Sequence, residues 1–292
     1  MTTTIKYFSK MLFAFVLCSG LVMTSCETAD PTDNGKDPDN SENSENPENP
    51  GTPEIPANII IFDDDIVKKS CVEVFDTDGD GEVSYDEAAA VKYLSHVSLR
   101  FVDEFLTFDE FQYFINVKSI PDNFFNGGKY LKSIAFPEGL ETIGESAFSG
   151  CTSLKEVEFP ERLETIGERA FSGCTSLAEV ELPEGLESIG SQFDHCVKLK
   201  KIKFSRGFRT VDQFAFAECR NLKEVHFPNG LLGIWSSAFQ DSDLDRMYCA
   251  STTPPSLFTY LKCKTVYVPH ESVESYKNAS GWKDYDIYGY DF

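Results

Sequence analysis

The sequence is organised by the stretch Gly-Leu-Glu-Thr-Ile-Gly-Glu-Ser-Ala-Phe-Ser-Gly-Cys-Thr-Ser-Leu at residues 139–154, which returns almost unchanged at residues 162–177. Weaker copies follow, and the residue pairs that open the five copies are spaced 23, 23, 22 and 23 residues apart. These pairs are Phe136-Pro137, Phe159-Pro160, Leu182-Pro183, Phe204-Ser205 and Phe227-Pro228. A fixed period in this range predicts stacked coils, because one such coil cannot bury its own apolar side chains.

Equivalent positions in the copies hold like residues, so stacking predicts continuous columns of side chains. One column is aromatic and consists of Phe148, Phe171, Phe193, Phe216 and Phe239. Another consists of Cys151, Cys174, Cys196 and Cys219. We interpret these thiols as buried packing groups, since coils about 4.8 Å apart hold Cβ atoms beyond the usual disulfide range. Only Cys249 and Cys263, outside the column, remain as a candidate disulfide.

The copies resemble the BspA-like (Treponema-type) leucine-rich repeats of bacterial surface proteins, on the residues quoted from 139–154 and 162–177. The resemblance covers roughly the last two-thirds of the chain. It implies an α/β solenoid, a right-handed leucine-rich-repeat coil of about 23 residues per turn. We assign the clear repeats to residues 136–248, an N-terminal cap and degenerate first repeat to 97–135, and a C-terminal cap to 249–292. The resemblance also implies adhesion or protein–protein contact at a bacterial cell surface.

Residues 1–26 are typical of a secretion signal, with Lys6 and Lys10 before a short apolar run. The run ends in Met-Thr-Ser-Cys, which resembles a bacterial lipobox and implies lipidation of Cys26 after cleavage. The alternative is an ordinary signal peptide with an incidental cysteine. Residues 27–57 contain nine acidic residues and one lysine, which predicts a disordered acidic tether. We therefore expect a lipid-anchored cell-surface protein of the bacterial outer membrane.

Residues 76–87 match the calcium loop of an EF-hand, within a predicted helix-loop-helix over residues 58–96. The candidate ligands are Asp76, Asp78, Asp80, Glu82 through its backbone carbonyl, Ser84 through water, and Glu87 with both carboxylate oxygens. Alternate residues of a tight loop can aim several oxygens at one point, and calcium prefers six to eight oxygen ligands. Because the loop has no second copy, we expect a structural calcium ion. The alternative is an acidic surface loop that binds no metal.

Both ends of a solenoid need covering, because a terminal coil exposes an apolar face. The helix after the candidate calcium loop and an aromatic-rich segment at residues 101–115 are the expected N-terminal cap. At the other end, a last strand at 265–269, a short helix at 272–279 and a tyrosine-rich tail are the expected C-terminal cap.

The chain carries a net charge of −22, which argues against nucleic acid as a partner. No catalytic motif is present, so we expect no enzymatic activity. The outward strand positions form the candidate binding face, which comprises Glu158, Glu181, Lys201, Lys203, His226 and Tyr248. The alternative is that these charges only pair across neighbouring coils. The expected partner is a surface protein of a host or neighbouring cell, or a glycan bound for nutrient uptake, and we expect a monomer.

Overall fold

The computed structural model describes residues 58–94, 106–258 and 261–292, which belong to one compact unit. The predicted signal segment, Cys26 and the tether lie outside the described residues, as do residues 95–96 of the predicted helix-loop-helix and 97–105 of the predicted N-terminal cap. None of the helices in the described ranges has the length and apolar composition that a membrane span requires.

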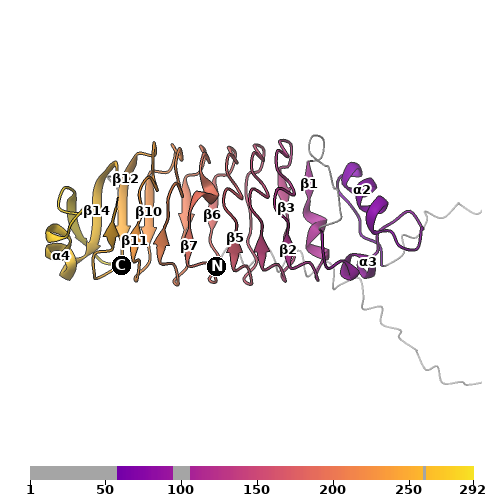
Figure 1. Ribbon diagram of the computed structural model, residues 1–292, viewed down its shortest axis with the longest axis horizontal. Coiled ribbons are helices and arrows are strands. Elements are labelled where there is room, and N and C mark those ends of the chain that lie inside the picture. Colours follow the sequence, from indigo (N-terminus) through magenta and orange to yellow (C-terminus); the bar gives the residue numbers. More distant parts are fainter. Residues whose placement is uncertain (1–57, 95–105, 259–260) are drawn as a thin grey trace, which may run out of the picture. The chain divides into compact units, whose positions relative to one another are not determined.

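From residue 106 onward the chain forms a β-solenoid of about eight turns with repeats of about 22 residues, which confirms the predicted solenoid. The coils stack in chain order (Figure 1), and their named strands pair in parallel. The later coils share a six-stranded sheet in the order β15-β14-β12-β10-β8-β6. Its strands are β6 (Glu179–Glu181), β8 (Lys201–Lys203), β10 (Glu224–Phe227), β12 (Leu244–Cys249), β14 (Cys263–Pro269) and β15 (Asp286–Tyr290).

Each coil also contributes a two-residue strand to a second ladder. These strands form a three-stranded sheet in the order β2-β4-β5 and a four-stranded sheet in the order β13-β11-β9-β7. The first comprises β2 (Ser119–Ile120), β4 (Thr142–Ile143) and β5 (Thr165–Ile166); the second comprises β7 (Ser188–Ile189), β9 (Thr210–Val211), β11 (Gly233–Ile234) and β13 (Ser256–Leu257). At the start of the solenoid, β1 (Thr107–Phe108) pairs with β3 (Ser133–Ile134). The second residue of each such strand points into the core, except at Leu257 of β13, which is half-buried.

The segment between the two ladders is built from turns rather than α-helix. Ser146 and Gly150 have φ angles of 54° and 73°, and Arg169 and Gly173 repeat them at 55° and 69°. Left-handed residues at a spacing of four interrupt the backbone hydrogen bonds that an α-helix needs. The coil centred on Phe193 is one residue shorter and forms a 3-10 helix there, η2 (Ser191–Phe193). The repeats themselves are therefore strand and turn.

The predicted phenylalanine column is present and lies in the core. Successive ring centroids from Phe125 through Phe239 are 4.9, 5.1, 5.6, 6.4 and 5.3 Å apart, and the rings are stacked. The rings of Phe148 and Phe171 are only 2° from parallel. Each ring thus covers the face of the next, which is the mutual burial that the repeat spacing predicts.

The cysteine column is also present, and its thiols are free. Each Sγ donates a hydrogen bond of 3.2 Å to the carbonyl oxygen of the phenylalanine one coil back, for example Cys174 to Phe148. Ser242 takes the same position in the last coil and donates to Phe216 at 2.7 Å. The candidate Cys249–Cys263 disulfide is excluded. Cys263 lies opposite Leu244, five residues along β12 from Cys249, and about 16 Å of strand separates the two thiols.

The N-terminal end is covered by α2 (Asp65–Phe75), α3 (Tyr85–Ala90) and the 3-10 helix η1 (Asp109–Tyr113). Phe108, Phe111 and Phe114 are buried there, and the ring of Phe114 meets the ring of Phe75 from α2 edge-on at 5.0 Å. Asp64 caps α2 and also accepts a hydrogen bond from the backbone of Leu106 at 2.8 Å. These contacts attach α2 to the first coil, and the side chain of Asn116 donates to the Ala89 carbonyl of α3 at 2.7 Å.

At the C-terminal end, the expected last strand is β14 and the expected short helix is η3 (His270–Ser272) followed by α4 (Val273–Asn278). Trp282 and Tyr276 are fully buried, and the indole N–H of Trp282 donates to the Pro255 carbonyl at 2.7 Å. The tyrosine-rich tail, for which the sequence analysis predicts no strand, adds β15 (Asp286–Tyr290) to the edge of the six-stranded sheet.

Candidate functional site

The first candidate site is the loop between α2 and α3. Asp76, Asp78 and Asp80 bring carboxylate oxygens within 4.8 Å of one another. Backbone N–H groups of the loop orient these carboxylates. Those of Gly79 and Gly81 donate to Asp76 at 2.6 and 2.9 Å. The backbone N–H of Asp80 donates to the Asp78 carboxylate, and that of Glu82 donates to the Asp80 carboxylate. Gly79 and Gly81 have φ angles of 79° and 85°, a conformation that glycine adopts without strain. The three aspartates could hold an ion.

The other three predicted ligands are placed differently. The Glu87 carboxylate reaches across the loop and accepts hydrogen bonds from the backbone and hydroxyl groups of Thr77 and Ser84 at 2.6–3.0 Å. These donors, above all the Ser84 backbone N–H, lower the pKa of Glu87 to about 2. Ser84 caps α3 in a capping box with Glu87. The side chain of Glu82 forms an ion pair with Lys68 at 2.7 Å, which leaves its backbone carbonyl as the only predicted ligand atom.

The second candidate site is the outward face of the six-stranded sheet. Strand register aligns one row of side chains across it, consisting of Glu181, Lys203, His226, Tyr248, Tyr267 and Tyr288. Four of the six predicted face residues belong to this row. Lys201 lies in the neighbouring row, and Glu158 is exposed on the coil before β6.

Ion pairs join several of these residues across the strands. Lys203 pairs with Glu181, and Lys201 lies 3.8 Å from Glu179. Glu224 contacts His226 at 2.5 Å and Arg246 at 2.7 Å. The cross-coil pairs expected from the sequence therefore exist, but pairs between exposed groups contribute only about 0–1 kcal/mol. They do not prevent the same side chains from meeting a ligand.

The C-terminal part of the face is aromatic; the sequence analysis includes His226 and Tyr248 in it but not Tyr267 and Tyr288. The rings of His226 and Tyr248 stack at 4.2 Å and 5°, and those of Tyr248 and Tyr267 at 4.7 Å and 13°. The ring of Tyr290 meets both tyrosines edge-on at 5.0 and 5.9 Å. Tyr267 and Tyr288 lie outside the five repeats, so only the register of β14 and β15 could have aligned them with His226.

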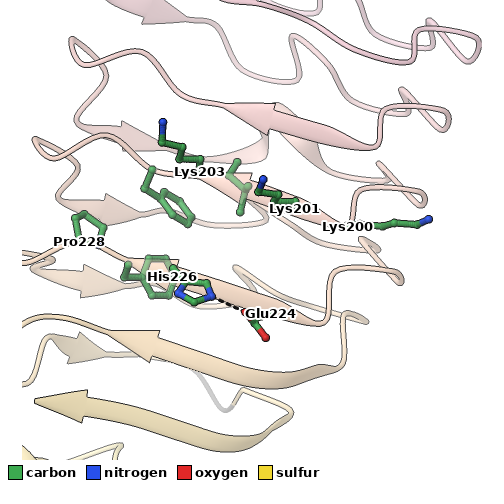
Figure 2. A pocket seen from close by; sticks show the side chains of 9 residues that line it. Lys200, Lys201, Lys203, Glu224, His226 and Pro228 are labelled. Carbon is green, nitrogen blue, oxygen red and sulfur yellow. Dashed lines mark hydrogen bonds and ion pairs between the residues drawn. The ribbon is translucent and has the colours of Figure 1, made fainter. Parts of the chain in front are cut away.

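A hollow of about 620 Å³ opens on this face between β8 and β10 (Figure 2). Its rim is polar and its floor apolar, and it is lined by Lys200, Lys201, Ile202, Lys203, Phe204, Glu224, His226, Phe227 and Pro228. In the register of the described strands, β8 and β10 align through one residue pair, whereas β10 and β12 align through four. The Phe193–Phe216 ring distance beneath this junction, 6.4 Å, is also the longest in the column. The hollow therefore lies where two neighbouring coils separate.

A sequence profile described as "BspA type Leucine rich repeat region (6 copies)" matches residues 118–245 and 190–279. Together these matches span more than half of the 292 residues. The chain belongs to the BspA-type leucine-rich-repeat family. No curated protein sequence matches this BspA-type chain.

Solved leucine-rich-repeat structures are similar to this BspA-type chain over part of its length. A leucine-rich-repeat protein of T. pallidum is 30% identical over 46% of this chain and 64% of its own, with a TM-score of 0.35. One from Bacteroides ovatus is 18% identical over 63% and 65%, with a TM-score of 0.35. A leucine-rich cell surface protein of Faecalibacterium prausnitzii is 19% identical over 60% and 58%, with a TM-score of 0.29. The chain thus spans less than two thirds of each of these proteins.

Proposed function

We propose that this chain is a non-catalytic binding module of a bacterial cell surface, and that it acts in adhesion through the outward face of its six-stranded sheet. The observation that carries the proposal is the composition of that face. Six strands align acidic, basic and aromatic side chains in continuous rows, while the core residues beneath them face inward. Such extended sheet surfaces are how stacked-repeat proteins usually bind their partners.

The lipid anchor on Cys26 belongs to this proposal, because a tethered module reaches partners outside the cell. Replacing Cys26 with Ser should release the protein from the membrane fraction and abolish incorporation of a labelled fatty acid. Membrane retention without label in either form would contradict the anchor.

A panel of host-matrix proteins and a glycan array test the binding function. The protein without its signal should bind at least one arrayed partner, and Glu181→Lys with Lys203→Glu should reduce that binding at least tenfold. The matched control is Trp235→Ser, because Trp235 is 41% exposed and belongs to the other ladder of strands. Equal binding by both variants would contradict the assignment of the face.

Glycan binding is the second candidate, and the hollow between β8 and β10 favours it. A pocket with an apolar floor and a few convergent polar groups is typical of small-molecule sites. On the glycan array, binding should then be sensitive to substitutions at His226 and Lys203, while binding to matrix proteins should not be detected.

We further propose that Asp76, Asp78, Asp80 and Glu87 hold one calcium ion that stabilises the N-terminal cap. Calcium needs more oxygen ligands than three aspartates supply, so the Glu87 carboxylate would leave Thr77 and Ser84 and turn inward. While it keeps those hydrogen bonds its pKa is about 2, so the carboxylate is already ionised before a metal arrives. Metal binding would fix the ends of α2 and α3, both of which contact the first coil.

Calorimetry tests this calcium site. The wild type should release or absorb heat on titration with calcium, and Glu87→Gln should weaken binding at least tenfold, because glutamine keeps the capping box but loses the charge. Asp86→Asn is the matched control, since Asp86 bonds to Asn58 and lies outside the aspartate group. A wild type that gives no calcium heat, or equal affinity in all three proteins, would contradict the site.

A further inference from the structure

We propose that the hollow between β8 and β10 is a subsite for one carboxylated sugar residue, a uronic acid, of an anionic glycan. The inference rests on the proposed function of the outward face and names the ligand that one part of this face recognises. Its volume of about 620 Å³ lies within the range of about 300–1,000 Å³ that is typical of small-ligand sites. A sugar ring has an apolar C–H face and a polar rim, which suits an apolar floor surrounded by polar groups.

One wall of the hollow is the free face of the His226 imidazole. Its other face is covered by Tyr248, whose ring lies parallel to it at 4.2 Å. Because the two rings stack across the strands, the free face turns toward β8, where Lys203 is the register partner of His226. The side chain of His226 is 56% exposed. A flat, half-exposed ring backed by a second ring is a rigid surface against which a sugar ring can pack.

The charge of this coil points to an acidic ligand. Between Asp194 and Asp212 the sequence has six basic residues and no acidic one, in a chain whose net charge is −22. Lys200, Lys201 and Lys203 line the hollow. Figure 2 shows the ammonium group of Lys203 turned away from His226, toward its ion-pair partner Glu181. That pair is about 60% exposed on both sides, so redirecting the lysine toward a bound carboxylate costs little.

The position of Glu224 favours a glycan over an acidic peptide. Its carboxylate lies on the rim and is oriented by His226 at 2.5 Å and by Arg246 at 2.7 Å. Hydroxyl groups of a sugar can donate hydrogen bonds to this carboxylate while the sugar's own acid group meets the lysines. A run of acidic side chains would bring like charge against Glu224 and has few donors to offer it. The rim therefore contains one group for each polar feature of a uronic acid.

The repeat spacing accounts for the position of the hollow at this junction. The interval of 22 residues ends at Phe204, and the shortened coil fills its gap with Gln192, which donates to the Ile166 carbonyl at 2.9 Å. In the turn segment of the following junction, one described backbone bond joins the coils, from His195 N–H to the Ala217 carbonyl at 2.8 Å, whereas Phe148 and Gly150 both bond across theirs. Elsewhere on this junction Arg209, Thr210 and Asp212 still donate to the coil before them. Phe204 and Phe227, which are 8% and 2% exposed, form the floor of the hollow.

Calorimetry with the protein without its signal tests the subsite, with tetragalacturonate as the probe and galactotetraose as its neutral counterpart. We expect binding of tetragalacturonate only, weakening as salt is raised. Lys201→Gln with Lys203→Gln should weaken it at least tenfold. The matched control is Lys264→Gln with Lys277→Gln, since these lysines also pair with acidic residues but lie away from the hollow. His226→Ala should lower the affinity, while His226→Phe, which keeps a ring face, should stay within threefold of the wild type.

Four results would overturn the proposal: no tetragalacturonate binding, equal binding of galactotetraose, equal binding of poly-L-glutamate, or no effect of the Lys201 and Lys203 substitutions relative to their control. The array experiment keeps the two hypotheses separate. If the face variant loses an arrayed partner while tetragalacturonate does not bind, the binding function holds and the subsite is wrong. If tetragalacturonate binds the hollow and no arrayed partner depends on the face, the adhesion role is wrong.

Discussion

Replacing Phe171 with Ala tests the central claim that the coils are stable only through their shared column of rings. Phe171 is fully buried. Its ring stacks on Phe148 at 5.1 Å and on Phe193 at 5.6 Å, and it meets Phe159 edge-on at 5.5 Å. Truncating a buried phenylalanine costs about 3–5 kcal/mol. Because the ring is stacked on both faces, we expect a loss in the free energy of unfolding near the upper end, about 4–5 kcal/mol.

Guanidinium unfolding measures this loss, followed by far-ultraviolet circular dichroism and by the fluorescence of Trp235 and Trp282. Phe258→Ala is the matched control, because Phe258 is 55% exposed and stacks on one ring, that of Trp235. It should cost no more than about 1 kcal/mol. A loss below about 1 kcal/mol for Phe171→Ala, or one equal to the control, would refute the reasoning that mutual ring burial holds the coils together.

Three further predictions concern single positions. Gly167→Ala should lower the free energy of unfolding by at least about 2 kcal/mol, because a Cβ there would lie 2.5 Å from the Glu145 backbone nitrogen. Gly190→Ala, in the same position of the shortened coil, should lower it less, since the nearest atom to its Cβ would be 3.6 Å away; equal shifts of the melting temperature would contradict this. Glu110 is buried, and desolvation raises its pKa, so the native protein loses stability as the pH rises above 4.5. The melting temperature of Glu110→Gln should therefore rise relative to that of the wild type between pH 4.5 and 8; a difference that does not change with pH would disprove the effect. Burial raises the pKa of Cys151 and Cys219 to about 12, whereas Cys263 is half-buried with a pKa of about 11. Mass spectrometry of the alkylated native protein should therefore find Cys263 modified first; earlier labelling of Cys151 or Cys219 would argue against the burial of the column.

The solenoid could be predicted from the sequence because its main determinants are local spacings. Phe148 and Phe171 occupy the same position in coils of equal length, so parallel stacking brings their rings together without any further information. The loop between α2 and α3 is similar, since Asp76, Asp78 and Asp80 are two residues apart in one turn. The carboxylates converge because the loop backbone hydrogen-bonds to them, a pattern that the glycines at 79 and 81 permit.

The outward face of the six-stranded sheet could be predicted only in part, because it depends on alignment between distant segments. Glu181, Lys203 and His226 come from repeats and were aligned by the period. Tyr267 and Tyr288 come from irregular sequence and join the row only through the registers of β14 and β15. The strand in the tail was not predicted, because its alternation of polar and aromatic residues is short; it forms by pairing with the edge of β14.

The hollow could not be predicted at all. The interval of 22 residues before Phe204 is visible in the sequence, but its effect is expressed one coil later, where β8 and β10 diverge. That effect depends on how Gln192 fills the shortened coil and on how far the next ring shifts, and both are properties of packing rather than of pattern.

The hydrogen bonds of the cysteine column also bear on how such a chain can change in length. Each of the four thiols in the column donates to the carbonyl of a phenylalanine in the coil before it. Unequal recombination between the near-identical segments 139–154 and 162–177 would add or remove one complete turn. Each new neighbour would find its donor, acceptor and ring partner already in place, so the reach of the molecule can be altered in steps of one turn while both of its ends remain covered.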